Sequence, residues 1–193
     1  MKSKFLTAAA CAALWTATAN ATPIIYATDL SGPAENPANG STATGHAVVT
    51  IDVIAHTLRV EVVFAGLSSG NTAAHIHCCI AAPGNAPVAT VTPTFTGFPS
   101  GTTAGSYDHT FNLTDVASFR AQFITDHGGT VAGAEADLAA GLASRQAYLN
   151  IHTTNFGGGE IRGFLNEVPE PASFALLGVG LTALVAARRN RVA

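Results

Sequence analysis

The stretch AAHIHCCIAAPGNAPVATV, residues Ala73 to Val91, places two histidines and two adjacent cysteines in a segment with strand character. Side chains alternate between the two faces of an extended chain. The predicted apolar face comprises Ala74, Ile76, Cys78 and Ile80, and the opposite face His75, His77 and Cys79. Half-buried strands of this kind are typical of antiparallel sheets that cover a core on one side.

The polar face of this strand has the spacing of metal ligands. Two imidazoles two residues apart can reach a common copper or zinc ion, and a thiolate at Cys79 can join His75 and His77 as a soft third ligand. A simpler interpretation is that these residues only form the wetter side of a strand. Both interpretations stay open at the level of sequence.

The rest of the chain predicts a mainly β domain. Further strands are expected at 24–30, 46–53, 58–64, 88–91, 107–112, 146–153 and 160–165. Helical spacing at 116–123 and 135–144 predicts two short helices that cover the strands. Strands at both ends, with the helices inserted late, indicate an antiparallel β-sandwich, Ig-like or superoxide-dismutase-like, and not a βαβ array.

Residues 46–64 predict a hairpin with a tight turn at Ala55-His56. This turn opposes residue 53 to 58, 51 to 60 and 49 to 62, and it sets Asp52 against Arg59 as a cross-strand ion pair. His56 is then a turn residue and not a ligand.

The cysteines allow three arrangements. Removal of a leader that contains Cys11 leaves Cys78 and Cys79 alone, which excludes a framework of disulfides. Adjacent Cα atoms lie closer, at ~3.8 Å, than the ~4.4 to 6.8 Å usual for bridged cysteines. A strained bridge between neighbours, two buried thiols and metal ligation remain.

Both ends of the chain have the composition of targeting segments. Residues 1–21 contain Lys2 and Lys4, an apolar run and a closing Ala19-Asn20-Ala21, which predicts a signal peptide and a mature start at Thr22. At the other end an uncharged apolar run at 172–187 precedes a basic tail. This run predicts a hydrophobic helix in the membrane, shorter than the ~20 residues of a comfortable span, with its tail in the cytoplasm.

The domain between the ends, 22–168, has four arginines, no lysine and eleven acidic residues, a formal charge of −7. Nucleic acid is an improbable partner for such a surface, because affinity for phosphates comes chiefly from clustered basic residues. Glu160 and Arg162, two apart on one strand, are interpreted as a solvated ion pair. The chain contains no G-x-S-x-G or Walker pattern, so the sequence favours a protein that is not an enzyme.

Pro169-Glu170-Pro171, the apolar run 172–187 and the arginines Arg188, Arg189 and Arg191 together resemble the PEP-CTERM sorting signal of Gram-negative bacteria. This resemblance covers residues 169–193. It implies an inner-membrane intermediate, cleavage by an exosortase-type membrane protease, and release to the cell surface or an exopolysaccharide matrix. Signal peptidase, the exosortase and then exopolysaccharide or surface proteins are the partners it implies.

AAHIHCCI with PGNAPV, QAYLNIHT and GGGEIRGFL together resemble the chordin-type (CHRD) domain over roughly 24–166. The family shows an A-H-I-H strand, a Y-x-N-x-H-T strand and a closing G-E-I-R-G. The resemblance implies an antiparallel β-sandwich in an extracellular protein. Cys78-Cys79 departs from the family pattern, so the role of the cysteines is particular to this chain.

The family motifs contain His75, His77 and His152, which we expect to cluster on the polar sides of two strands. Cu/Zn superoxide dismutase holds copper with a similar H-x-H strand and a later histidine. The likeness is partial, since no zinc ligand set and no arginine placed to guide an anion are identified, and His109 is a further candidate ligand without a motif. The leading interpretation is an exported, non-enzymatic CHRD protein. The alternative is a copper- or zinc-binding sandwich with superoxide-dismutase-like redox activity.

Overall fold

The structure is a computed structural model that describes residues 22–169. The strands are β1 (Ile24–Ser31), β2 (Thr44–Asp52), β3 (Thr57–Ala65), β4 (Asn71–Cys78), β5 (Gly105–Asn112), β6 (Ala147–Thr153), β7 (Ile161–Phe164) and β8 (Asn166–Glu167). The helices are α1 (Ala121–Asp126) and α2 (Val131–Ala143), with short 3₁₀ turns η1 (Gly32–Ala34) and η2 (Val116–Ser118). The predicted leader 1–21, the predicted hydrophobic helix 172–187, and Glu170, Pro171, Arg188 and Arg189 lie outside the described residues. Between residues 22 and 169, no helix combines the length and apolar character that a membrane crossing requires.

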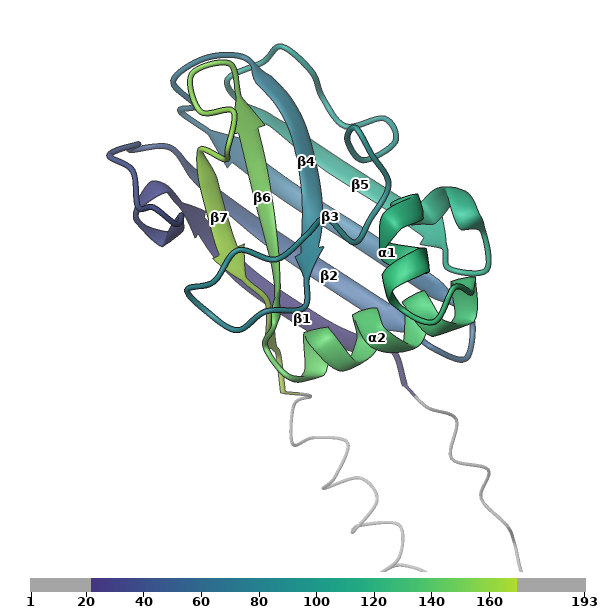
Figure 1. Ribbon diagram of the computed structural model, residues 1–193. Helices are drawn as coiled ribbons and strands as arrows, with labels where there is room; N and C mark the ends of the chain where they lie inside the picture. The colour runs from purple at the N-terminus through teal and green to yellow at the C-terminus, as the bar shows by residue number, and fades with distance from the viewer. Residues whose placement is uncertain (1–21, 170–193) are drawn as a thin grey trace, which may run out of the picture.

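The strands form one antiparallel sheet in the order β4-β6-β7-β1-β2-β3-β5, with β8 beside β1. Figure 1 shows this sheet curled into two layers, with β4, β6 and β7 in front of β1, β2, β3 and β5. The layers join through β7 and β1, where Ser31 pairs with Arg162. The predicted antiparallel, mainly β fold with two short helices is therefore confirmed, and its two layers belong to a single curled sheet.

The core between the layers orients the histidine strand. Ile76 pairs with Leu149, and Ala74 pairs with Ile151; all four side chains are fully buried in the core. Burial of a large aliphatic side chain contributes roughly 1.5 to 3 kcal/mol. Because strand faces alternate, this burial sends the intervening histidines to the opposite face, away from the core.

The chain after β4, residues 79–95, covers that opposite face and is called the covering segment. It crosses in front of β6 and β7 in Figure 1 and then follows the outer edge of β4, where the N–H groups of Ala89 and Phe95 donate to the carbonyls of Ile76 and Ala74. The strand predicted at 88–91 is reduced to isolated bridges, such as His77 with Val88. This covering segment brings backbone carbonyls over the histidines.

The β2–β3 hairpin forms with a register shifted by two residues from the predicted one. Arg59 lies opposite Thr50, and Ile51 lies opposite Leu58. The turn is longer than expected because the Asp52 carboxylate accepts the N–H groups of Ile54 and Ala55. The guanidinium of Arg59 therefore binds Asp108 on β5, at 2.7 and 2.9 Å, and not Asp52. His56 is a turn residue, as predicted.

The helices also differ in extent from the prediction. The first expected helix, 116–123, is divided into η2 and the later α1, while α2 starts at Val131, before the expected 135. The Thr130 hydroxyl accepts the N–H of Gly133 and caps α2. In Figure 1 both helices lie at one end of the two layers, as expected for covers of the sheet.

Of the three arrangements open to the cysteines, the structure has the bridge between neighbours, Cys78 to Cys79. Cys78 is fully buried at the end of β4. Both sulfurs lie against α2 at Gly141, and the Cys79 sulfur lies 3.5 Å from the carbonyl oxygen of Asp137. The absence of a side chain at Gly141 is what lets α2 approach the disulfide.

We expect Gly141→Ala to destabilise the domain. Alanine in a helix interior is ordinarily about 1 kcal/mol more favourable than glycine, but a Cβ at this position overlaps the Cys78 sulfur and lies 2.7 Å from that of Cys79. Overpacking of this kind costs about 1 to 3 kcal/mol. Urea unfolding measures the change. Ala140→Gly, on the exposed face of α2, reports the helix propensity alone, and a Gly141→Ala protein more stable than the parent would contradict the packing argument.

Candidate metal centre

Three histidines meet on the outer face of the β4-β6-β7 layer. His75 and His77 come from β4 and His152 comes from β6, and one ring nitrogen of each lies within 4.8 Å of the other two. The ring centroids are 5.2 Å apart for His75 and His152, 5.8 Å for His75 and His77, and 6.2 Å for His77 and His152. The predicted clustering of these three side chains is confirmed.

The register of β4 and β6 brings these histidines together. Asn150 lies directly opposite His75, while His77 faces Tyr148 and His152 faces Ala73. Each polar side chain on one strand is thus beside or diagonal to a polar side chain on the other. These distances are within reach of imidazole rings.

Each histidine uses one ring nitrogen to donate to a backbone carbonyl. His75 Nε2 lies 2.5 Å from the oxygen of Pro93, His77 Nδ1 lies 2.8 Å from that of Ala86, and His152 Nδ1 lies 2.9 Å from that of Gly157. A carbonyl oxygen only accepts, so these three nitrogens carry the protons. The hydrogen bonds therefore fix the tautomer and orientation of every ring.

The second nitrogen of each ring is left with a free lone pair. His75 Nδ1, His77 Nε2 and His152 Nε2 are shielded from solvent and have no hydrogen-bond partner within residues 22–169. A buried polar atom without a partner costs about 1 to 3 kcal/mol. Donation of one N–H to a carbonyl with the other nitrogen free is the arrangement of metal-ligating histidines.

Burial keeps the three imidazoles neutral. It lowers the pKa of His75 and of His77 from 6.5 to about 4, with the neighbouring histidines adding to the shift. Burial likewise lowers the pKa of His152. Neutral imidazole is the form that binds a metal ion, so the rings are in the ligating form at neutral pH.

Asn150 occupies the middle of the polar face of β6 and was missed by the sequence analysis as a site residue. It is 2% exposed, and its Oδ1 is buried without a hydrogen-bond partner in the described part of the chain. It lies between Tyr148 and His152 along the strand and opposite His75. Its place on the alternating face of QAYLNIHT is the signal that identifies it.

A buried arginine supports the site from the neighbouring strand. Arg162 is 1% exposed and donates to the carbonyl oxygens of Ala34 and Pro83 and to Asn85 Oδ1. Its guanidinium lies 4.7 Å from the Tyr148 ring centre, and that ring stacks on His77 at 4.7 Å. Arg162 therefore ties the covering segment to the layer that carries the histidines.

The solvated pair expected between Glu160 and Arg162 is wrong, because both side chains are buried. Arg162 has Glu35 as its acidic neighbour, at 3.7 Å, and burial raises the pKa of Glu35 to about 7. Glu160 instead accepts hydrogen bonds from Ser41, Ser68 and Thr153. Burial would raise the pKa of Glu160, but these bonds outweigh it and the pKa is lowered.

Cys79 does not join the histidines. The strand ends at Cys78, so the alternation that would place the next residue beside His77 stops there. The Cys79 sulfur is bonded to Cys78 and lies against α2, and a disulfide sulfur is not the thiolate that the predicted ligand requires.

His109, the further candidate, lies outside the cluster on β5. Its ring centroid is 6.1 Å from that of Tyr107 and 4.6 Å from that of Phe111.

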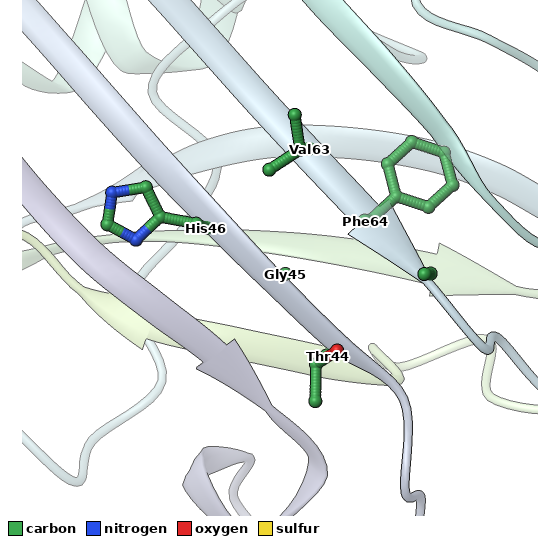
Figure 2. A pocket seen from close by; sticks show the side chains of 6 residues that line it. Thr44, Gly45, His46, Val63 and Phe64 are labelled. Atoms are coloured by element: carbon green, nitrogen blue, oxygen red, sulfur yellow. The ribbon is translucent and has the colours of Figure 1, made fainter.

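An open surface pocket of about 310 Å³ lies at the ends of β2 and β3. Figure 2 shows His46 and Val63 projecting from these two strands, with Gly45 contributing no side chain. The Nδ1 atom of His46 is 2.8 Å from Asp29 Oδ1 and is thus already paired. This pocket presents one histidine without a second ligand, so the histidine cluster is the better candidate site.

Comparison with known proteins gives two matches of family models. The model described as the CHRD domain matches residues 26–165. The model described as the PEP-CTERM protein-sorting motif matches residues 167–191. No curated protein and no solved structure matches the chain. Both resemblances noted in the sequence are therefore confirmed.

The histidine burial predicts a specific pH dependence of stability for the metal-free protein. Below pH 6.5 an unfolded imidazole takes up a proton, whereas folded His75 stays neutral until about pH 4. The free energy of unfolding therefore loses about 1.4 kcal/mol per pH unit for each such proton as the pH falls through this window. We expect His75→Gln to take up one proton fewer than the parent when it unfolds in this pH window. Urea unfolding from pH 4 to pH 7, with chelator present, measures this number as the slope of the unfolding free energy against pH.

Comparison of two proteins isolates this effect. Glu35, whose pKa is raised, acts in the opposite direction in the same pH range, but it is common to both proteins and cancels in the difference. His46→Gln, at an exposed histidine outside the cluster, is the matched control for the substitution itself. An identical pH slope for His75→Gln and the parent would show that His75 is not held neutral by burial.

Proposed function

Because this chain belongs to the CHRD-domain family and carries a PEP-CTERM sorting motif, we propose that it is an exported protein whose folded domain binds a copper or zinc ion. The ligands are His75, His77 and His152. The observation that carries the proposal is a cluster of three histidines, with one ring nitrogen of each within 4.8 Å of the others, in which every ring also has a buried nitrogen without a hydrogen-bond partner among the described residues.

The nature of the ligands supports this choice of ion. Imidazole nitrogen suits copper and zinc, whereas magnesium and calcium prefer sets of oxygen ligands. Nitrogens about 2.0 to 2.1 Å from zinc are about 3.4 Å from one another in a tetrahedral site. The nitrogens here lie within 4.8 Å of one another, so a contraction of at most about 1.4 Å brings all three to the spacing of ligands on one ion.

The sorting motif supports the proposed route of export. The PEP-CTERM motif implies surface sorting in a Gram-negative bacterium with an exosortase-type processing partner. We place a signal peptide at 1–21, the mature domain at 22–168 and the sorting segment at 169–193, with Pro169, Glu170, Pro171, Arg188 and Arg189 as its signal. The released domain acts at the cell surface or in the extracellular matrix, next to exopolysaccharide or surface proteins.

A role in holding the ion, and not in catalysis, is consistent with the shielding of the site. All three free nitrogens are inaccessible to solvent. The covering segment, held by the hydrogen bonds of Arg162 and of the histidines themselves, lies between them and the surroundings. An organic substrate therefore has no open route to the ion, and we propose a non-enzymatic protein.

The metal prediction is tested by replacement of one ligand. We expect the mature exported protein to bind one equivalent of copper or zinc. His77→Ala should weaken this binding more than about 100-fold, because removal of a group that only hydrogen-bonds to a ligand already lowers metal affinity about 10- to 100-fold. Calorimetry and elemental analysis measure the affinity and the bound metal. Near-ultraviolet circular dichroism verifies that the variant is folded.

Two controls make this result specific. His46→Ala removes an exposed histidine outside the cluster and should leave binding unchanged. Loss of fold in metal-free His77→Ala would indicate a structural histidine, and His152→Ala, at a partly exposed ring, then gives an independent test of ligation. The absence of bound copper or zinc at micromolar concentrations in the parent would refute the proposal.

Processing is tested by the mass of the released protein. The leader, the Pro-Glu-Pro element and the arginine tail predict a mature chain that starts near Thr22 and ends close to Val168. Intact-mass spectrometry of the protein released from cells measures both ends. Detection of Arg191 in that form would contradict cleavage of the sorting segment.

A further inference from the structure

We infer that the three-histidine site selects monovalent copper, Cu(I), over divalent ions. This inference rests on the proposed metal function and names its ligand. It follows from two independent features of the site, namely the number of ligands that the protein supplies and the charges that surround them.

The first feature is the coordination number. Among residues 22–169 the ligating groups that converge are the nitrogens of His75, His77 and His152. Structural zinc is almost always four-coordinate, and Cu(II) prefers four ligands in a tetragonal arrangement. Cu(I), a closed-shell ion, is satisfied by three nitrogens in a trigonal arrangement. A site of three imidazoles is therefore complete for Cu(I), whereas Zn²⁺ or Cu(II) needs a further ligand such as water.

The structure offers no strong fourth ligand in its described part. The Cys79 sulfur is bonded to Cys78 and lies against α2. A further buried polar atom without a partner is Asn150 Oδ1, from the strand position opposite His75. A neutral amide oxygen is a hard donor that suits magnesium, calcium or manganese better than copper or zinc.

The second feature is charge. The three ligands are neutral, so a bound ion keeps its full charge in a shielded site. The electrostatic cost of burying an ion grows with the square of its charge, so a divalent ion costs about four times as much as a monovalent one of similar size. Cysteine thiolates or carboxylates offset this cost in many zinc sites, and neither is present in this cluster.

The charged residues around the cluster increase this difference. Arg120 acts as a positive charge on His75. Arg162, fully buried, lies over the Tyr148 ring that stacks on His77. The acidic neighbour of Arg162 is Glu35, which offsets that arginine and leaves no surplus negative charge for the ion. The positive charge of the partly exposed Arg120 would thus oppose a divalent ion more strongly than a monovalent one.

The test compares the affinities of three ions for the mature exported protein. It is titrated without oxygen with Cu(I) against a chromogenic Cu(I) chelator, and in separate experiments with Cu(II) and Zn(II) against chelators of known affinity. We expect one equivalent of Cu(I), bound at least 100-fold more tightly than Zn(II) and more tightly than Cu(II). X-ray absorption of the Cu(I) form should show three nitrogen neighbours. His77→Ala should abolish this binding, and His46→Ala should preserve it.

The outcomes separate the two proposals. Tighter binding of Cu(II) or Zn(II) than of Cu(I), with loss of that binding in His77→Ala, would overturn the selectivity and leave the metal site itself in place. Four or more neighbours around the Cu(I) ion would also overturn the inference. A protein that binds none of the three ions would refute both the selectivity and the proposed function.

Discussion

The antiparallel pairing of β4 with β6 is the constraint on which the site depends. Burial of Ile76 and Leu149 on the core side fixes which face of each strand is outward, and the register then sets the histidines of both strands beside one another. A shift of one residue would bury the imidazoles and expose the aliphatic side chains. The same hydrophobic packing that stabilises the sheet therefore also assembles the histidine cluster.

Pairing alone does not orient the rings, and the covering segment supplies what the strands cannot. The carbonyl oxygens of Ala86 and Pro93 accept one N–H from each histidine of β4, and that of Gly157, in the turn after β6, serves His152. The other nitrogen of each ring then stays buried without a hydrogen-bond partner among the described residues. The cluster thus combines histidines from the sheet with orienting groups from irregular backbone, which is tied down by Arg162.

Alternation of apolar and polar residues, together with the motifs of the CHRD family, predicted the fold and the three histidines, because strand faces depend only on odd or even position. Alternation did not predict the register of β2 and β3, which differs from the expected one by two residues. A shift of two keeps every side chain on its face, so only the hydrogen bonds of Asp52 in the turn decide it. The role of Cys79 was wrong because alternation ends with the strand. The environments of Glu160 and Arg162 depend on contacts with distant loops, which spacing within one strand does not report.

The wide separation of β4 and β6 along the chain has a consequence for when the site comes into being. The segment between them includes β5 and both helices, so His152 meets His75 and His77 only after this long loop has closed, a slow kind of contact in folding. The histidine cluster does not exist in an extended chain. Under the proposed metal function, loading of an ion would follow folding, and the compartment in which the chain folds would determine which metal pool it samples.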